Sequence, residues 1–284
     1  MSSVTVPRTL ADALRVLADF PDATVLGGGT DLMVELNSGH RRASKVVAVN
    51  RIGELCSWQH DPERATLHLG AGITYSEIEH SPIAGWVSAL AQAARTVGSP
   101  QIRHAATIGG NLGTCSPAGD GLPVLSALEA VVHLASAAGE RALPFAEFMI
   151  GPKRTARQPG ELITGVTLPV LNGWQGYSKV GVRNAMVIAV ASASLVVDDR
   201  QHQVRLALGS VGPVILRCPE AEALVAVEGD FATGRIRTSV VAQFAELARR
   251  TARPIDDHRS TAEYRRHAVG VLAARQLRRA FPVG

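Results

Sequence analysis

Two glycine-rich segments are the part of this sequence whose residue types and spacing could do chemistry. The first reads Gly27-Gly-Gly-Thr-Asp-Leu32, and the second reads Thr107-Ile-Gly-Gly-Asn-Leu-Gly-Thr114. Glycine adopts positive φ without strain, so such segments can turn several backbone N–H groups toward one anion. Each segment alone is explained equally well as a structural turn. Two of them in one chain indicate a shared anionic ligand, such as the pyrophosphate of a dinucleotide.

The spacing excludes two common nucleotide-binding motifs. Leu32 stands where the third glycine of a Gly-x-Gly-x-x-Gly motif is required, and no Gly-Lys-Ser/Thr sequence follows. The nicotinamide-type Rossmann motif and the Walker motif therefore both fail. A dinucleotide bound here needs another arrangement of loops.

Further polar residues have positions that could serve a bound ligand. Asp120 precedes an apolar run, where its carboxylate can cap a helix, accept hydrogen bonds from ribose hydroxyls, or do both. Lys179, Gly181 and Arg183 alternate along a predicted strand, which places them on one face and lets a flat group approach at the glycine. The resulting positive strip either contacts a ligand or forms a solvated basic edge.

Cysteine and histidine spacing argues against a metal centre held by this chain. Cys56, Cys115 and Cys218 are too few and too far apart for an iron–sulfur cluster, a zinc knuckle or a disulfide framework. None of the nine histidines has a His-x-x-x-His or His-Glu-x-x-His spacing. Without a recognisable neighbouring base, Cys115 is expected to be a small buried thiol rather than a nucleophile.

Composition indicates a folded, soluble protein with more than one domain. The 284 residues are 46% hydrophobic and 19% charged, and 27 glycines and 15 prolines predict many tight turns. A net charge of +4 without any long run of like charges gives no support to nucleic-acid binding. No export signal and no apolar stretch of about 18 residues is visible, and the sparse cysteines suit a reducing compartment. We therefore expect a cytoplasmic protein without a membrane span.

Hydrophobic periodicity predicts a mixed chain of helices and strands. Helices are expected over 10–20, 32–36, 76–83, 86–97, 122–128, 239–250 and 260–281. Strands are expected over 23–26, 46–49, 65–72, 130–134, 161–168, 177–183, 187–197 and 204–211. The turn-rich stretch 169–174 is the expected domain boundary.

Longer stretches around these residues resemble one family. Gly27–Leu32 resembles the first FAD loop of the flavoprotein subunit of molybdenum hydroxylases, and the stretch 98–120 resembles the second. This family includes the medium subunit of carbon monoxide dehydrogenase and the FAD portion of xanthine dehydrogenase. Residues 177–183 and 254–265 are similar to the opening strand of its C-terminal domain and to the segment before its last helix. Gly27 and Cys115 depart mildly from the pattern, because alanine is common at the first position and alanine or glycine at the second.

The resemblance implies an α+β fold in two domains. Residues 1–173 are then a two-lobed PCMH-type FAD-binding domain, with a small α/β lobe over about 1–54 and a larger lobe with an antiparallel sheet over 55–173. Residues 174–284 are then a carbon monoxide dehydrogenase flavoprotein-like C-terminal domain, built of a three-stranded antiparallel sheet with helices.

The resemblance also implies which residues bind FAD. The two glycine segments and the lack of a cysteine or histidine in a recognisable flavin-attachment setting predict that this binding is non-covalent. Lys179 is in addition expected to act on the flavin itself, because reduced flavin tends toward an anion and a cation beside it favours reduction. The implied FAD-binding residues are Leu26, Gly27, Gly28, Gly29, Thr30, Asp31, Leu32, Thr107, Ile108, Gly109, Gly110, Asn111, Thr114, Ser116, Asp120, Lys179 and Arg183.

The implied function is electron transfer within a multi-subunit oxidoreductase. A molybdopterin-binding large subunit oxidises the substrate, [2Fe-2S] clusters on a small iron–sulfur subunit carry the electrons, and the FAD of this chain delivers them to an external acceptor. The subunits are expected to assemble as a dimer of heterotrimers. Two alternatives are a stand-alone FAD oxidoreductase of the same fold, such as an enolpyruvyl-sugar reductase, and a non-enzymatic nucleotide-binding module.

The last predicted helix carries a row of basic side chains. They either meet an acidic partner or form a solvated helix face. These side chains are Arg265, Arg266, Arg275, Arg278 and Arg279.

Overall fold

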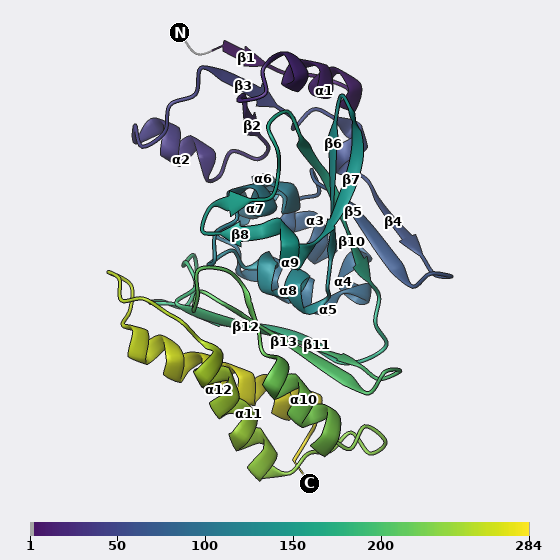
Figure 1. Ribbon diagram of the computed structural model, residues 1–284, viewed down its shortest axis with the longest axis vertical. Helices are drawn as coiled ribbons and strands as arrows, with labels where there is room; N and C mark the ends of the chain where they lie inside the picture. Colours follow the sequence, from purple (N-terminus) through teal and green to yellow (C-terminus); the bar gives the residue numbers. More distant parts are fainter. Residues whose placement is uncertain (1–2, 284) are drawn as a thin grey trace. The chain divides into compact units, whose positions relative to one another are not determined.

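The computed structural model describes residues 3–283, which form two compact units of helices and strands (Figure 1). The first unit comprises residues 3–77, 100–115 and 130–169, and the second comprises 78–99, 116–129 and 170–283. Both units are discontinuous in sequence, and the domain limits expected near residues 54 and 173 stay predictions. Among the described residues, no helix is both long enough and apolar enough to cross a membrane.

A small parallel sheet in the first unit leads into the first glycine segment. Its strands are β1 (Ser3–Thr5), β2 (Thr24–Leu26) and β3 (Lys45–Ala48), and β3 lies between the other two. Helix α1 (Leu10–Asp19) begins after Thr9, whose side chain accepts a hydrogen bond from the N–H of Asp12. Ala13 and Leu17 of this helix are fully buried in a core with Val47. Helix α2 (Leu32–Asn37) starts directly after the glycines.

A five-stranded antiparallel sheet forms the larger part of the first unit. The strands lie in the order β4, β5, β10, β6, β7. Strand β10, the last of these five in the sequence, is therefore the central one. Val166 and Leu168 of β10 pair with Leu69 and Leu67 of β5, and all four side chains are fully buried. The strands span Trp58–Asp61 (β4), Thr66–Gly70 (β5), Leu162–Pro169 (β10), Val131–Ser136 (β6) and Gly139–Pro144 (β7).

Short elements connect these strands and include the second glycine segment. That segment, expected as a loop, is mostly the helix α7. Ile108 and Leu112 are one helical turn apart and fully buried, which explains why the helix forms despite its glycines. The short elements are η1 (Gly53–Cys56), α3 (Tyr75–His80), α6 (Pro100–Ala105), α7 (Ile108–Thr114), α9 (Phe145–Phe148), β8 (Met149–Gly151) and β9 (Arg154–Thr155).

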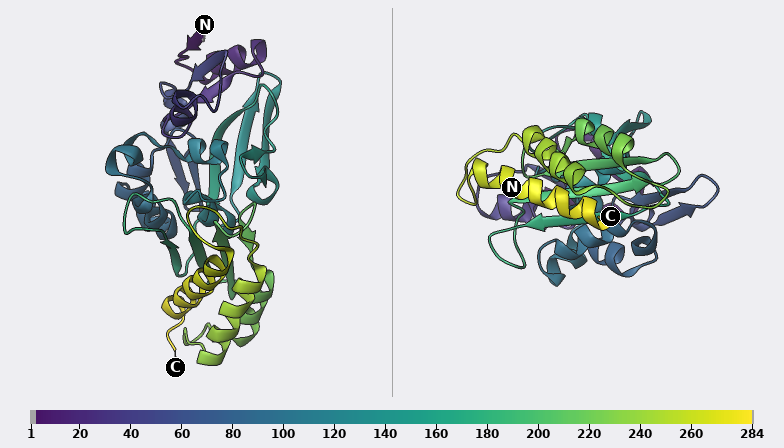
Figure 2. Two further views of the ribbon diagram at one scale, coloured as in Figure 1. Left: turned by 90° about the vertical axis from the view of Figure 1, so that its left-hand side faces the viewer. Right: turned by 90° about the horizontal axis from the view of Figure 1, so that it is seen from below.

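The second unit is an antiparallel sheet with helices on both faces (Figures 1 and 2). Its strands lie in sequence order: β11 (Gln175–Val180), β12 (Ala191–Asp198), β13 (Gln203–Gly209) and β14 (Leu216–Arg217). Helices α10 (Pro219–Glu228), α11 (Thr238–Thr251) and α12 (Ala262–Ala280) cover one face. Helices α5 (Ser88–Thr96), preceded by α4 (Ile83–Trp86), and α8 (Gly121–Ala127) lie against the other. The three expected strands are present, and β14 adds a short fourth.

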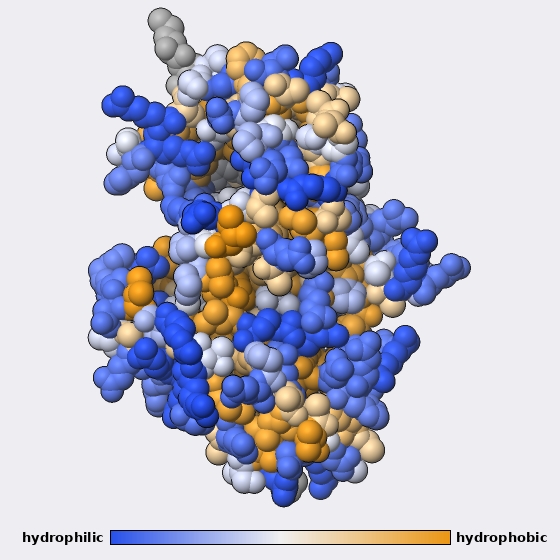
Figure 3. Space-filling view, viewed as in Figure 1, coloured by the Kyte–Doolittle hydropathy of each residue, from blue (hydrophilic) through white to orange (hydrophobic). Residues whose placement is uncertain are grey.

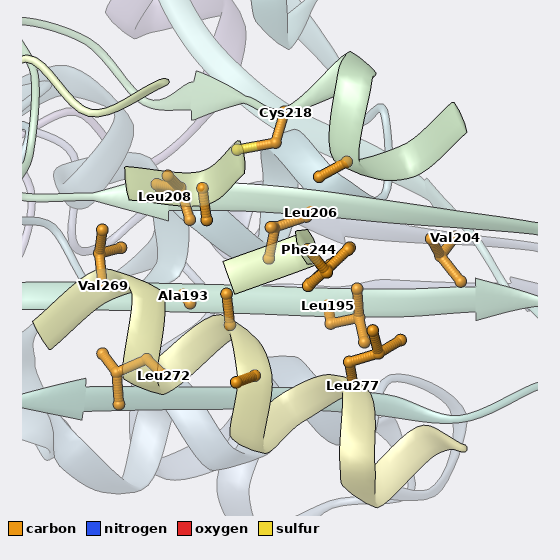
Figure 4. Close-up of a cluster of buried hydrophobic side chains, with 14 of the residues drawn as sticks. Ala193, Leu195, Val204, Leu206, Leu208, Cys218, Phe244, Val269, Leu272 and Leu277 are labelled. Carbon is orange, nitrogen blue, oxygen red and sulfur yellow. The ribbon is translucent and has the colours of Figure 1, made fainter. Parts of the chain in front are cut away.

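The core of this unit lies between the sheet and the helices α10, α11 and α12. Figure 4 shows Leu195 and Leu206 of the sheet pointing toward Phe244 of α11 and toward Leu272 and Leu277 of α12. Each of these side chains is at most 6% exposed. Burying a side chain of this size contributes about 1.5 to 3 kcal/mol, so this layer holds the sheet and helices together.

The opposite face of the sheet carries polar side chains that are equally buried. Ser192 and Ser194 alternate with the apolar residues of β12 and are 1% and 0% exposed. A Cβ on Gly209 would lie 2.4 Å from Ser192 Oγ and 2.8 Å from Pro123 Cγ of α8. The missing side chain at position 209 therefore lets α8 approach the sheet closely.

Most predicted elements are confirmed within a few residues, but the strand expected over 177–183 is too long. Strand β11 ends at Val180, and the chain then turns. Gly181 and Arg183 therefore do not continue the strand face on which Lys179 lies. The expected strip of three alternating residues is wrong, because the hairpin is closed by a hydrogen bond from Val190 N to Val180 O.

The expected basic face of the last helix is also wrong in one position. Arg265 is 3% exposed and donates to Val190 O at 2.8 Å, Ser210 O at 3.0 Å and Asp257 Oδ1 at 2.7 Å, so it is a structural residue of the second unit. In the lower part of Figure 3, over α10 to α12, hydrophobic residues are visible between hydrophilic ones. The arginines of α12 that are exposed are Arg266, Arg275, Arg278 and Arg279.

Candidate functional site

The first glycine segment makes a close backbone contact that only glycine permits. A Cβ on Gly28 would lie 1.7 Å from the carbonyl oxygen of Ala105. Gly29 has a φ of 74°, in the left-handed region that glycine adopts without strain. Leu26 ends β2, Thr30 lies in the turn, and α2 begins at Leu32. The contact between Gly28 and Ala105 therefore places the first glycine segment directly against the residues that precede the second.

The second glycine segment is held at the start of α7. Thr107 caps this helix, and its hydroxyl accepts a hydrogen bond of 2.9 Å from Gly110 N. Gly109 packs on Ala71, because a Cβ at position 109 would lie 2.5 Å from the Ala71 Cβ. Gly109 N also donates to Ala71 O at 2.9 Å. The helix ends at Cys115, which has a φ of 50°.

The structure brings the two glycine segments together within the first unit. A Cβ on Gly27 would lie 3.4 Å from Thr107 Oγ1. At the other end of α7, the Thr114 hydroxyl donates to Asp31 Oδ2 at 3.2 Å. Asp31 precedes α2 but makes no side-chain cap bond there, so its carboxylate serves this contact instead. The segments are thus joined by side chains at both ends.

The β8–β9 hairpin connects both segments to a third part of the chain. Lys153 N donates to Cys115 O at 3.0 Å, directly after α7. The Lys153 ammonium forms an ion pair with Glu35 of α2. The Lys153 hydrogen bond holds the pKa of Glu35 below its usual value. The hairpin therefore fixes the positions of α2 and the end of α7 relative to each other.

A buried acceptor near the glycines lacks a protein donor. Among the described residues, Asn111 Oδ1 is buried and accepts no hydrogen bond. A buried polar atom without a partner costs about 1 to 3 kcal/mol, so such atoms commonly mark a ligand site. A dinucleotide offers both an anionic pyrophosphate and hydrogen-bond donors. It therefore fits a site with two glycine segments, which lack side chains, and one buried acceptor without a partner.

The second unit holds the other predicted polar residues. Asp120 precedes α8 but makes no side-chain cap bond to that helix, so the expected cap is wrong. Its Oδ1 accepts from the Tyr177 hydroxyl at 2.8 Å, and its Oδ2 accepts from Lys179 Nζ at 2.7 Å. Burial raises the pKa of Asp120, while the Lys179 ammonium and the Tyr177 hydroxyl oppose that rise. Both carboxylate oxygens thus bind protein donors in place of the helix N–H groups, and the role of Asp120 as a ribose acceptor stays a prediction.

Lys179 is enclosed by three acceptors. Besides Asp120 Oδ2, its ammonium donates to Thr96 O at 2.8 Å and to Val187 O at 3.0 Å. The side chain is 8% exposed. Because an ammonium has three N–H donors, the protein uses all of them. Lys179 can then influence a ligand by its charge without donating a hydrogen bond to it.

Among residues 3–283, the side-chain hydrogen bonds of Arg183 and Ser116 are local. Arg183 is exposed and donates to Ala185 O and Met186 O in its own turn. Ser116 accepts from Ala118 N at 3.2 Å, in the turn before α8. Neither contact identifies a ligand-binding role, so their assignments stay predictions.

Sequence reasoning missed Tyr177, Thr96 and Val187 as neighbours of the site. Tyr177 lies two residues before Lys179, so the alternation of a strand already places both on one face. That spacing is a usable signal. Thr96 and Val187 contribute backbone carbonyl oxygens to Lys179, which no residue type can indicate, and the Thr96 side chain also hydrogen-bonds to Asp120 and opposes the rise in its pKa.

The three cysteines are free thiols, of which Cys115 and Cys218 are buried and Cys56 is exposed. Burial raises the pKa of Cys115 to about 11, so its thiol stays protonated at neutral pH. Within residues 3–283, no group of three or more His, Cys, Asp or Glu side chains could hold a metal ion.

Two family models match this chain, and both describe parts of the same kind of flavoprotein. Residues 1–171 match the family described as the FAD binding domain in molybdopterin dehydrogenase. Residues 177–280 match the CO dehydrogenase flavoprotein C-terminal domain. The two matches follow each other along nearly the whole chain.

Relatives and solved structures agree with these matches. The chain is 36% identical over 203 residues to the nicotinate dehydrogenase FAD-subunit of Eubacterium barkeri, with 68% of each chain covered. It is 30% identical over 274 residues to the glyceraldehyde dehydrogenase medium chain of Sulfolobus acidocaldarius, with 95% of each covered. Reconstituted CO dehydrogenase from Oligotropha carboxidovorans matches with a TM-score of 0.90 at 25% identity, over 99% of this chain and 97% of that chain. The glycine segments and these matches show that the chain belongs to the family of FAD-binding flavoprotein subunits of molybdenum-containing dehydrogenases and hydroxylases, which are oxidoreductases.

Proposed function

We propose that this chain holds one FAD and passes electrons through it from [2Fe-2S] clusters of a partner subunit to an external acceptor. The observation that carries the proposal is the meeting of the two glycine segments, at Gly27 against Thr107 and at Thr114 with Asp31. The unpaired acceptor Asn111 Oδ1 lies on α7, directly after the glycine pair at positions 109 and 110. These features support a site that accommodates a pyrophosphate along exposed backbone.

The chain's own residues divide the work of holding the cofactor. Backbone N–H groups of Gly27–Leu32 bind the pyrophosphate in this proposal, since the absence of side chains lets phosphate oxygens approach them. In the second segment, Gly109 N and Gly110 N donate to Ala71 O and Thr107 Oγ1, so that segment contributes the space beside its glycines instead. Leu26, Asn111, Thr114 and the other residues named by the resemblance complete the site. Bound FAD exchanges electrons singly or in pairs, which suits a subunit between one-electron clusters and a two-electron acceptor.

Lys179 and Asp120 tune the electrostatics of the flavin in this proposal. The buried ammonium favours the anionic reduced form, and the carboxylate partly offsets that charge. Lys179→Met should therefore lower the midpoint potential of bound FAD. The expected change is on the order of 1 to 3 kcal/mol for a partly buried charge.

The remaining redox centres must lie on partner subunits. Cys56, Cys115 and Cys218 are free thiols, and the chain has no fourth cysteine. A four-cysteine cluster therefore has no ligand set within residues 3–283. We infer a small iron–sulfur subunit and a large molybdopterin-binding subunit as partners, assembled as a dimer of heterotrimers.

Two measurements test the proposal. The purified chain, incubated with FAD and desalted, should show the absorbance of oxidised flavin, and acid should release FAD intact. Co-expression with an iron–sulfur subunit and a molybdopterin-binding subunit should yield a complex with both flavin and iron–sulfur absorbance. A chain that stays colourless in excess FAD would overturn the FAD assignment. Rapid oxidation of an aldehyde or purine by the isolated chain would instead support a stand-alone oxidoreductase.

A further inference from the structure

We infer that Tyr177 is a positioning residue that acts through the Asp120 carboxylate on the charge balance around Lys179. This inference rests on the proposed function, because its consequence is read in the potential of bound FAD. All three side chains belong to the second unit and are almost completely buried. They form a chain of contacts from hydroxyl to carboxylate to ammonium.

Tyr177 is itself held in place. Its N–H donates to Gln92 Oε1 of α5 at 2.9 Å, and its backbone pairs with Ser194 on the neighbouring strand. Tyr177 is 5% exposed, and its hydroxyl donates to Asp120 Oδ1 at 2.8 Å.

The hydroxyl helps to orient the carboxylate and, beside the larger effect of the Lys179 ammonium, favours its ionised form. With Oδ1 bound to Tyr177, Asp120 presents Oδ2 to Lys179 at 2.7 Å. A hydrogen bond donated to a carboxylate stabilises its charged form, and burial acts in the opposite direction. Removing the hydroxyl therefore weakens the negative charge beside Lys179, by rotation of the carboxylate or by uptake of a proton.

The consequence for the flavin has a defined sign. The positive charge of Lys179 favours reduced, anionic flavin, and the negative charge of Asp120 opposes it. When the negative charge of Asp120 is reduced, the net positive charge that acts on the flavin increases. Tyr177→Phe and Asp120→Asn should both raise the flavin midpoint potential, whereas Lys179→Met should lower it. Ordinary loosening of a buried core predicts no such pattern of signs.

A double-mutant cycle isolates the role of the hydroxyl. We expect Tyr177→Phe to raise the potential by roughly the equivalent of a tenfold change in the redox equilibrium, about 30 mV for two electrons. In the Asp120→Asn background the same substitution should have no further effect, since its target is gone. Tyr264→Phe is the matched control, because it removes a phenol hydroxyl from a half-exposed ring on α12. The titrations use the full chain loaded with FAD.

The outcomes separate this inference from the proposed function. Wild-type protein that binds no FAD, or a Lys179→Met protein with an unchanged potential, would overturn the proposed electrostatic role itself. If Lys179→Met lowers the potential but Tyr177→Phe leaves it unchanged or lowers it, the positioning role of Tyr177 is wrong. An equal effect of Tyr177→Phe with and without Asp120 would also overturn it. Should the Asp120→Asn protein not fold, the sign of the Tyr177→Phe shift against the Tyr264→Phe control decides.

Discussion

Thr114 and Asp31 lie 83 positions apart in the sequence, and the Thr114 hydroxyl donates a 3.2 Å hydrogen bond to Asp31 Oδ2. The bond joins the last residue of α7 to the residue before α2. It closes the arrangement that begins where Gly28 touches Ala105. The two segments that we propose to bind FAD are therefore held by each other as well as by their own helices.

Removing this bond should weaken FAD binding without unfolding the chain. Thr114→Val keeps the size of the side chain and loses the hydroxyl. A single hydrogen bond to a charged group that is open to water contributes about 1 kcal/mol, or roughly a fivefold change in Kd. Fluorescence titration with FAD measures the change, and Thr114→Ser, which keeps a hydroxyl, should bind like the wild type. A Thr114→Val protein with unchanged affinity would show that the bond does not support the site.

A side chain at Gly110 should block FAD while the protein still folds. Added Cβ atoms at Gly28 and Gly109 would collide with backbone atoms, whereas one at Gly110 would lie 3.1 Å from the Thr107 side-chain oxygen and requires only a small shift of that side chain. Gly110→Val would fill space that the cofactor needs, so we expect loss of flavin absorbance after reconstitution. Gly113→Val on the same helix is the control, since its Cβ would lie 3.7 Å from Ile163 Cδ1. Equal flavin content in the two variants would contradict the assigned location of the site.

Acid should destabilise the chain partly through Glu161. This carboxylate accepts from Arg141 Nε at 2.5 Å and Nη2 at 2.8 Å and from Gln158 N at 2.6 Å. The Arg141 bonds hold the pKa of Glu161 below its usual value of 4.5. The unfolded chain then binds more protons between the two pKa values, so this contribution is complete above about pH 4.5 and is lost as the pH falls through the folded-state pKa.

Glu161→Gln tests that contribution by thermal unfolding. At pH 7 the variant should lose about 2 kcal/mol, because a buried charged hydrogen-bond acceptor is replaced by a neutral one. The difference in Tm between wild type and variant should shrink as the pH is lowered from 7 toward 3. A constant difference over this range would mean that ionisation of Glu161 does not stabilise the fold.

Thiol labelling should distinguish the three cysteines. Burial raises the pKa of Cys115 to about 11 and that of Cys218 to about 12, so neither forms thiolate at pH 8. Cys56 is exposed. Brief treatment of the folded chain with iodoacetamide, followed by peptide mass spectrometry, should find the label on Cys56 alone, and all three should react in denaturant. Early labelling of Cys115 would revive the idea that it is a nucleophile.

The sequence predicted helices and strands best where the apolar pattern within the element itself determines its structure. Helices α1, α11 and α12 follow their apolar spacing, and β2, β3 and β10 follow their buried runs. Strand β7 was missed because its pattern is polar and mostly exposed, and only pairing with β6 makes it a strand. Helix α7 was expected to be a loop because glycine disfavours helices, yet the burial of Ile108 and Leu112 outweighs that preference.

The site was predicted in its residues but not in its contacts. The glycine types and spacing were sufficient to propose an anion site, since conformational freedom is a property of the residue itself. The three acceptors around Lys179 come from α5, from the residue before α8, and from the turn after β11. Such a meeting depends on tertiary packing, and for the same reason Arg265 could not be recognised as buried from its basic neighbours.

The central place of β10 has a consequence for synthesis on the ribosome. Strands β5 and β6 both pair with β10, so the five-stranded sheet cannot close until residues 162–169 have been made. Until then the nascent chain carries strand edges and apolar side chains without their partners, which is the condition in which chains aggregate or need chaperones. The sheet also supports Ala71, on which Gly109 rests. The surroundings of the second glycine segment can therefore form only after residues 162–169 have been made, so we expect cofactor binding to follow closure of this sheet.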